Sequence, residues 1–291
     1  MSDDHWRDAV LAAVASSPAH AKWRRCGGSS LNATWELRCD GGRYFIKTND
    51  AAHLAMFEAE AEGLRELGKA QVLRIPKPLA TGSAAHSAYL VLEHVEIAGK
   101  NCGVALGTAL AQLHAIKASD FGWHRDNTIG TTPQRSTRDA DWIVFWREQR
   151  LVPQLALAVR NGYRRDLEHY GMRLAERLPG FFASYTPVPS LLHGDLWGGN
   201  WGCLDSGEPV IFDPAFYYGD READLAMTEL FGGFTPRFHA AYQAAWPLDA
   251  GYGVRKDLYN LYHILNHLNL FGAGYLSQAQ SMLGRLLAEV T

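Results

Sequence analysis

The chain has 291 residues, of which 47% are hydrophobic, and it carries a formal net charge of −3 at pH 7. This length and apolar content suit one large domain or two lobes that share a cleft. The mild acidity argues against a nucleic-acid partner that is held mainly by electrostatics. No apolar run approaches the roughly 18 residues of a membrane span, and the first residues show neither the basic nor the apolar region of a signal peptide.

The four cysteines, Cys26, Cys39, Cys102 and Cys203, lie far apart and form no C-x-x-C pair. This spacing is more typical of a reduced, cytosolic protein than of a disulfide or zinc framework. We therefore expect a cytoplasmic protein whose cysteines are reduced.

The first 95 residues predict a mixture of strands and one helix. Alternation over 34–39 and the returning segment 43–47 predict two strands, which the turn Asp40-Gly41-Gly42 joins into a hairpin. Residues 51–69 change to a helical period, and residues 88–93 predict a buried strand.

Beyond residue 95 the pattern is mostly helical, with apolar stripes such as Leu258, Leu261, Leu265 and Leu268, and the main extended interruption lies near 190–215. We expect an α+β fold with a small β-rich lobe over 1–95, which binds nucleotide, and a larger helical lobe over 96–291, which holds the catalytic loop and the acceptor site. This order of lobes is that of protein-kinase-like enzymes.

The most informative segment is Leu191-Leu192-His193-Gly194-Asp195-Leu196-Trp197-Gly198-Gly199-Asn200, which is followed thirteen residues later by Asp213. Protein kinases use the same five-residue spacing between the catalytic Asp and a metal-binding Asn, followed by a second metal-binding Asp. Asp195 would accept the proton of the acceptor hydroxyl, and Asn200 and Asp213 would bind Mg²⁺ through hard oxygen atoms. A lone Asp after Gly is usually a turn residue, but chance rarely places all three together.

Lys47 ends a predicted strand, and Glu60 follows thirteen residues later in the predicted helix. In kinases such a Lys contacts the α- and β-phosphates of ATP and is held by a helix Glu. Glu58 and Glu62 compete for this role, but helical spacing places Glu60 closer than Glu62 to the apolar stripe. The alternative is a surface Lys and a solvated Glu.

Two backbone elements would complete the nucleotide site. Gly27, Gly28, Ser29 and Ser30 lie upstream of Lys47 and suit a loop whose N–H groups cover phosphates, although most Gly-Gly-Ser stretches are ordinary loops. Residues from Glu93 to Val95 follow the buried strand and would form the hinge, whose backbone could bind adenine.

His263 and His267 are four residues apart on one helix face, as zinc ligands sometimes are. No third ligand stands at a suitable spacing. One histidine facing the substrate or two ordinary packed histidines are the interpretations that stay open.

The chain resembles the fructosamine kinase (ketosamine 3-kinase) family over most of its length. The motifs that carry the resemblance are His-Gly-Asp-Leu-Trp-x-Gly-Asn at 193–200, Asp-Pro-Ala-x-x-Tyr-Gly at 213–219 and Phe-Gly-Gly-Phe at 231–234. His-Gly-Asp and the later Asp are shared with aminoglycoside kinases, whereas the longer motifs are much more specific to the ketosamine branch. In one departure from the family, Ser30 stands where many eukaryotic relatives carry a cysteine.

The resemblance implies ATP- and Mg²⁺-dependent phosphorylation of the sugar 3-hydroxyl of small-molecule or protein-bound ketosamines. We also expect a monomer without nucleic-acid or membrane partners. Loss of the phosphorylated sugar would then repair the amine. Trp197, Tyr217 and His267 are candidates for acceptor contacts. His193 and Asp224 would support the catalytic loop, with Asp224 buried at a helix start.

Two other classes stay open. One is an aminoglycoside- or choline-type small-molecule kinase, and Trp197 together with Phe-Gly-Gly-Phe argues against it. The other is a catalytically silent pseudokinase that acts as a binding module. Retention of Lys47, Asp195, Asn200 and Asp213 argues against that class.

Overall fold

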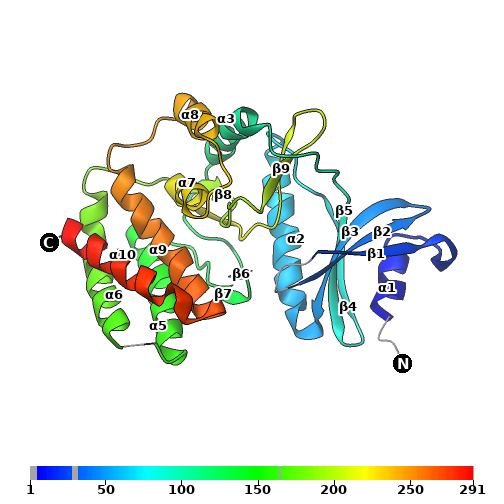
Figure 1. Cartoon of the computed structure of the whole chain (residues 1–291), viewed down its shortest axis with the longest axis horizontal. Coiled ribbons are helices and arrows are strands. Elements are labelled where there is room, and N and C mark those ends of the chain that lie inside the picture. Colours follow the sequence, from blue (N-terminus) through cyan, green and yellow to red (C-terminus); the bar gives the residue numbers. More distant parts are fainter. Residues whose placement is uncertain (1–4, 28–31, 164, 291) are drawn as a thin grey trace. The chain divides into compact units, whose positions relative to one another are not determined.

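The computed structural model describes residues 5–27, 32–163 and 165–290. The chain forms two compact units, which are shown as ribbons in Figure 1. The first unit comprises Met1–Cys102 and Trp201–Pro214, and the second comprises Gly103–Asn200 and Ala215–Thr291.

The first unit is built on one antiparallel sheet of five strands in the order β1-β2-β3-β5-β4. Its strands are β1 (Lys22–Cys26), β2 (Ala33–Cys39), β3 (Gly42–Asp50), β4 (Pro78–Ala84) and β5 (Ser87–Glu93). Its helices are α1 (His5–Ala13), α2 (Leu54–Lys69) and the 3₁₀ turns Pro18–His20 and Ala51–His53.

The two helices α1 and α2 cover opposite faces of this sheet (Figure 1). Ile46 of β3 packs in a core cluster with Trp6 and Val10 of α1, whereas the next residue, Lys47, reaches Glu60 of α2. Because successive side chains of a strand point to opposite faces, this single step in β3 separates an apolar face from the face that carries the lysine.

The predicted strands at 34–39, 43–47 and 88–93 and the helix within 51–69 are confirmed. The expectation of one helix in this region is wrong, because α1 is a second one. Trp6, Val10 and Leu11 of α1 are buried at helical spacing, but nine residues give too short a periodic signal to stand out.

A short hairpin of β9 (Trp201–Cys203) and β10 (Pro209–Ile211) also belongs to the first unit. Cys203 exchanges backbone hydrogen bonds with Ala98 and Gly99, and this pairing brings Cys102 to Cys203 with 5.8 Å between their Cα atoms. The two cysteines form a disulfide, so the expectation of four reduced cysteines is wrong for this pair. Cys26 and Cys39 are free.

The second unit is mainly helical. Its helices are α3 (Gly103–His114), α4 (Trp142–Trp146), α5 (Val152–Arg160), α6 (Arg165–Arg177), α7 (Arg221–Leu230), α8 (Pro236–Ala245), α9 (Tyr252–Phe271) and α10 (Leu276–Glu289), with a π-helical turn at Arg147–Leu151 and 3₁₀ turns at Leu178–Phe182 and Ala273–Tyr275. Two short antiparallel pairs complete it, β6 (Asn127–Ile129) with β7 (Thr132–Gln134) and β8 (Ser190–Leu192) with β11 (Tyr217–Gly219).

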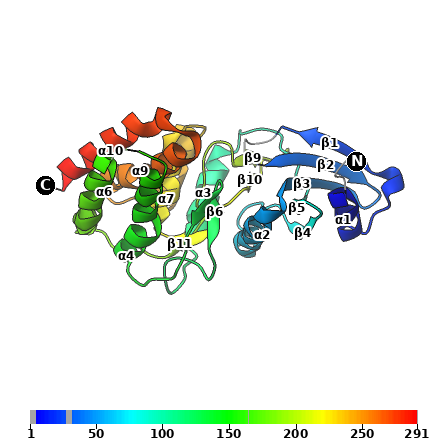
Figure 2. The same cartoon turned by 90° about the horizontal axis from the view of Figure 1, so that it is seen from below.

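Helix α9 packs against α5, α7 and α10, and its position beside α7 and α10 can be followed in Figure 2. The predicted stripe from Leu258 to Leu268 is buried in the main core cluster.

The β6–β7 hairpin was not expected, because each of its strands has only three residues. None of the helices in the described residues combines the length and apolar character that crossing a bilayer requires.

His263 of α9 is buried, and this burial is the main reason why the pKa of its imidazole falls to about 3. Between that value and the ordinary pKa of about 6.5, the unfolded chain binds one more proton than the folded chain. The free energy of unfolding should therefore decrease by about 1.4 kcal/mol for each pH unit as the pH falls from 6 to 4. His263→Leu should remove this contribution in urea unfolding at several pH values. His86→Leu, at an exposed turn, is the control, and an unchanged pH slope in the His263 variant would contradict the prediction.

Candidate active site

The catalytic loop begins directly after β8, at His193-Gly194-Asp195. Gly194 has a φ of +82°, and a Cβ there would lie 2.0 Å from the carbonyl oxygen of Ala215. Only glycine fits this turn. The Nδ2 atom of Asn200 donates to the backbone oxygen of Asp195 at 2.9 Å and to its Oδ2 at 3.3 Å, so the loop brings these two predicted residues together.

The carboxylate of Asp224 holds this loop from the first turn of α7. Its Oδ2 accepts the N–H of His193 at 2.7 Å, and its Oδ1 accepts the N–H of Gly194 at 2.8 Å. The residue is 1% exposed. Burial alone would raise the pKa of Asp224, but its contacts with His114, His193 and the N–H of Gly194 lower this pKa below its ordinary value. Asp224 therefore stays ionised and accepts both backbone bonds.

A buried polar chain leads from Asp224 to α8. The Nε2 atom of His114 lies 3.2 Å from Asp224 Oδ2, its Nδ1 lies 2.8 Å from the hydroxyl of Tyr242, and Arg221 Nη1 donates to the same hydroxyl at 3.2 Å. One arrangement of protons satisfies every bond, with Tyr242 donating to Nδ1 and the Nε2–H of His114 donating to Asp224. Sequence reasoning missed His114 and Tyr242, because an isolated His or Tyr on a helix gives no local signal.

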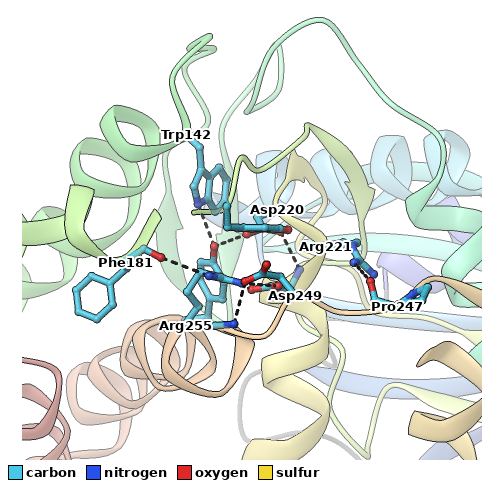
Figure 3. A network of polar contacts seen from close by, with 11 residues as sticks. Trp142, Phe181, Asp220, Arg221, Pro247, Asp249 and Arg255 are labelled. Carbon is cyan, nitrogen blue, oxygen red and sulfur yellow. Dashed lines mark hydrogen bonds and ion pairs between the residues drawn. The ribbon is translucent and has the colours of Figure 1, made fainter. Parts of the chain in front are cut away.

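The start of α7 is fixed by a second network, shown in Figure 3. Asp220 is the N-cap of α7, where it accepts the N–H of Glu222, and it also accepts the hydroxyls of Tyr185 and Tyr259. Arg255 of α9 binds both carboxylate oxygens of Glu222, at 2.7 and 3.0 Å. These buried bonds fix the register of α7, and this register places Asp224 one turn later against the loop.

The Phe-Gly-Gly-Phe segment packs its backbone directly against the catalytic loop. A Cβ at Gly198 would lie 2.8 Å from the carbonyl oxygen of Gly232 and 3.1 Å from the Cα of Gly233. A Cβ at Gly233 would lie 2.7 Å from the Cα of Gly198. The two segments approach each other so closely that neither Gly198 nor Gly233 can carry a side chain without displacing the other segment.

The three candidate acceptor residues lie in different surroundings. The side chain of Trp197 is 42% exposed, and its ring covers Gly199, where a Cβ would lie 2.2 Å from it. His267 is half-buried, has a Nδ1 that lies 2.8 Å from the carbonyl oxygen of His263, and packs its ring against Phe231. Tyr217 is buried, and burial is the main reason why the pKa of its hydroxyl is raised.

In the first unit, the ammonium group of Lys47 lies between two carboxylates. Its Nζ donates to Glu60 Oε1 at 2.6 Å and to Asp213 Oδ1 at 2.6 Å, although Lys47 is only 4% exposed. Burial lowers the pKa of Lys47, but the charges of Asp213 and Glu60 outweigh burial and raise that pKa above its ordinary value. The lysine is therefore a fixed positive charge. Asp213 has a φ of +59°, a left-handed conformation that is uncommon outside glycine and clusters at functional sites.

The hinge segment has one backbone donor that the fold leaves available. The N–H groups of Glu93 and His94 donate to the carbonyl oxygens of Lys77 and Arg43. Within the described residues, the N–H of Val95 has no such partner. The carboxylate of Glu93 accepts bonds from Arg74 and from the N–H of Lys77, so this side chain braces the hinge.

For the predicted phosphate loop, the structure places Gly27, whose carbonyl oxygen accepts the hydroxyl of Thr34. Gly28, Ser29 and Ser30 lie outside the described residues.

The family model described as fructosamine kinase matches residues 6–289. A Synechocystis protein named "probable ketoamine kinase" is 46% identical over 267 residues, which cover 91% of this chain and 90% of that protein. The chloroplastic protein-ribulosamine 3-kinase of Arabidopsis thaliana is 40% identical over 287 residues, with 97% and 87% of the two chains covered.

Solved structures show the same fold. A Haemophilus somnus protein described as a "putative fructosamine-3-kinase" has a TM-score of 0.87 and 26% identity, with 97% of this chain and 98% of that chain covered. An aminoglycoside phosphotransferase has a TM-score of 0.65 at 15% identity, which covers 99% and 98% of the chains and shows a common fold alone. The α+β, two-lobed kinase-like fold is confirmed. By the family match and the extent of these similarities, the chain belongs to the fructosamine kinase family and is a phosphotransferase.

Proposed function

We propose that the protein transfers the γ-phosphoryl group of ATP to the sugar 3-hydroxyl of ketosamines. The observation that carries the proposal is the loop in which Asp195 and Asn200 are joined and the loop backbone is held by buried Asp224. The names of the Synechocystis and Arabidopsis relatives support a ketosamine acceptor. The aminoglycoside phosphotransferase shares only the fold, so it does not favour an aminoglycoside acceptor.

In this proposal Asp195 accepts the proton of the 3-hydroxyl. The hydroxyl oxygen forms a bond to the γ-phosphorus, the bond from that phosphorus to the β–γ bridging oxygen breaks, and ADP leaves. The hydrogen bond from Asn200 and the packing of Gly198 keep the Asp195 backbone in one position. The phosphate on O3 is then a better leaving group than the hydroxyl. Its elimination leaves an imine, which water hydrolyses to the free amine and a dicarbonyl sugar.

The nucleotide would be bound mainly by residues of the first unit. Lys47 supplies a positive charge for the α- and β-phosphates, and Glu60 fixes its direction. The loop from Gly27 to Ser30 would cover the phosphates with backbone N–H groups. The available N–H of Val95 would donate to adenine, while Glu93 braces that segment.

Asn200 and Asp213 would bind Mg²⁺, because an amide oxygen and a carboxylate are hard oxygen ligands that fit this ion. Asn200 directs its Nδ2 toward Asp195, so the atom that would bind the ion is Oδ1. When bound, Mg²⁺ neutralises charge on the phosphates.

For the acceptor, we propose that the exposed Trp197 of the loop and the half-buried His267 of α9 contact the ketosamine. Tyr217 is buried and would support the site from beneath. We further propose that the enzyme is a cytoplasmic monomer. The acceptor would be a small-molecule or protein-bound ketosamine.

An ATP-consumption screen of fructosamine, ribulosamine and erythrulosamine acceptors, beside kanamycin and choline, tests the function. We expect turnover with ketosamines alone. Asp195→Asn is the matched variant, since it keeps the shape of the side chain and removes the base. Its turnover should fall by about 10²–10⁴-fold while nucleotide binding is retained. Preferred turnover of kanamycin or choline would refute the ketosamine proposal, and an Asp195→Asn enzyme within a few-fold of wild type would refute the role of the base.

Asp213→Asn tests the metal ligand. Asn tolerates the left-handed backbone of residue 213, so the substitution removes charge and leaves the turn intact. Activity measured against Mg²⁺ concentration should fall on the order of a hundredfold or more, and further than in Asn200→Ala. A normal Mg²⁺ dependence in Asp213→Asn would show that this carboxylate is no ligand.

Gly198→Ala tests whether the Phe-Gly-Gly-Phe segment positions the loop. The new methyl group would displace the loop from Gly232 and Gly233, and displacements of about 1 Å can cost ~10²-fold in rate. We expect a lower kcat at an unchanged KM for ATP. Gly232→Ala is the control, because its φ of +73° introduces backbone strain but a Cβ there meets no atom within 4 Å. Equal kcat values in the two variants would argue against positioning.

A further inference from the structure

The helical unit contains a hollow whose lining residues have no role in the reaction proposed above. Its volume is 490 Å³, and it is lined by Trp123, His124, Arg125, Asp126, Thr137 and Arg138. The lining residues come from the two sides of the β6–β7 hairpin, which precedes α4.

The lining is rich in positive charge and hydrogen-bond donors. The lining includes two arginines, one histidine and one carboxylate, and Oδ1 of that carboxylate, Asp126, accepts the N–H of Ser136 at 2.8 Å. Arg138 is exposed and has no ion-pair partner among the described residues. Arginine guanidinium groups bind carboxylates and phosphates through two parallel hydrogen bonds. The hollow therefore suits an anion.

The wall of the hollow is held rigidly. The N–H of Trp123 donates to the carbonyl oxygen of Ser136 at 2.8 Å, and the buried ring of Trp123 packs edge-on against Phe216. Gly122 has a φ of +95°, and a Cβ there would lie 2.6 Å from the same Ser136 oxygen. The cationic side chains thus extend from a backbone that is already fixed before any ligand binds.

The same backbone is joined to the catalytic loop within the helical unit. Gly122 exchanges two hydrogen bonds with Tyr218 of β11, at 2.7 and 3.0 Å. β11 in turn pairs with β8, where Tyr217 lies opposite Leu192, the residue before His193. Buried Asn127 adds a second connection between the hairpin and the segment before β11, since its Nδ2 donates to the carbonyl oxygen of Phe216 at 2.8 Å. One short sheet therefore connects the wall of the hollow and the loop that carries Asp195.

We propose that this hollow is an anion subsite for the acceptor, and that it binds a carboxylate of the amine component or a phosphate on the sugar of an anionic ketosamine. Arg125 and Arg138 pair with the anion, Thr137 donates its hydroxyl, and Trp123 packs against the carbon atoms that carry the charge. The inference rests on the proposed function and specifies its substrate class.

The test compares acceptors that carry a carboxylate, a phosphate or neither of these groups. Isothermal titration measures the affinity of the wild-type protein for the fructose adduct of glycine, for the matched adduct of glycinamide, and for the glycinamide adduct of fructose 6-phosphate. We expect the wild-type protein to bind at least one anionic adduct about three- to tenfold more tightly than the neutral one, as for charge-assisted bonds at a partly exposed site. The adduct that gains affinity identifies the source of the anion.

Variants then test whether the tighter binding of the anionic adduct depends on the arginines of the hollow. Arg138→Gln and the double variant Arg125→Gln/Arg138→Gln should reduce or abolish the preference and leave the affinity for the neutral adduct within about twofold. Arg135→Gln is the matched control, since Arg135 is an exposed arginine on the same segment and does not line the hollow. It should keep the preference.

Two outcomes would overturn the inference. One is equal affinity of the wild-type protein for all three adducts, including no binding of any. The other is an anion preference that survives in the double variant. Turnover of the neutral adduct is measured separately and tests the kinase function. A protein that binds anionic adducts through the arginines but phosphorylates none would support the subsite and refute the proposed reaction.

Discussion

The position of the catalytic loop depends on one buried carboxylate. Both oxygens of Asp224 accept backbone N–H groups, from His193 and Gly194, and a buried carboxylate that lost these partners would be costly. A loop conformation that moved these two N–H groups away would remove two of the hydrogen bonds that this carboxylate accepts. The oxygen of Asp224 that accepts the N–H of His193 also contacts Nε2 of His114, and the networks around Asp220 and Arg255 fix the register of α7. A loop rich in glycine is thereby held as firmly as a regular element.

In the first unit, too, a buried charge positions distant segments through its partners, but here the central charge is positive. Lys47 is a buried cation between two carboxylates, of which Glu60 comes from α2 and Asp213 follows the β9–β10 hairpin. Its two ion pairs therefore join three segments of the fold at one point. In both units a single buried charge gathers parts of the chain that are distant in sequence, and each of these charges lies next to a residue with a proposed role in the reaction.

Local spacing explains which parts of the site could be predicted from the sequence. Asp195 and Asn200 are five residues apart in one loop, and Lys47 and Glu60 are joined by a single strand-to-helix connection, so their proximity follows from short-range geometry. His114 and Tyr242 could not be found in this way, since they meet each other across 128 residues and carry no motif. The stripes of α9 and α2 were equally clear. Short elements such as α1, β6 and β7 were missed, because a nine-residue helix and three-residue strands are shorter than the windows in which periodicity can be recognised.

The disulfide between Cys102 and Cys203 changes the covalent topology of the chain. It closes a ring that contains all of residues 103–200, including α3 and the catalytic loop. Cys102 ends the first segment of the first unit, and Cys203 lies two residues after the chain returns to that unit. Residues 103–200 thus form an insertion into the first unit, and the disulfide joins the chain just before this insertion to the chain just after it. A protease that cuts once inside the ring opens it without releasing a fragment, and the two pieces separate only after the bridge is also reduced.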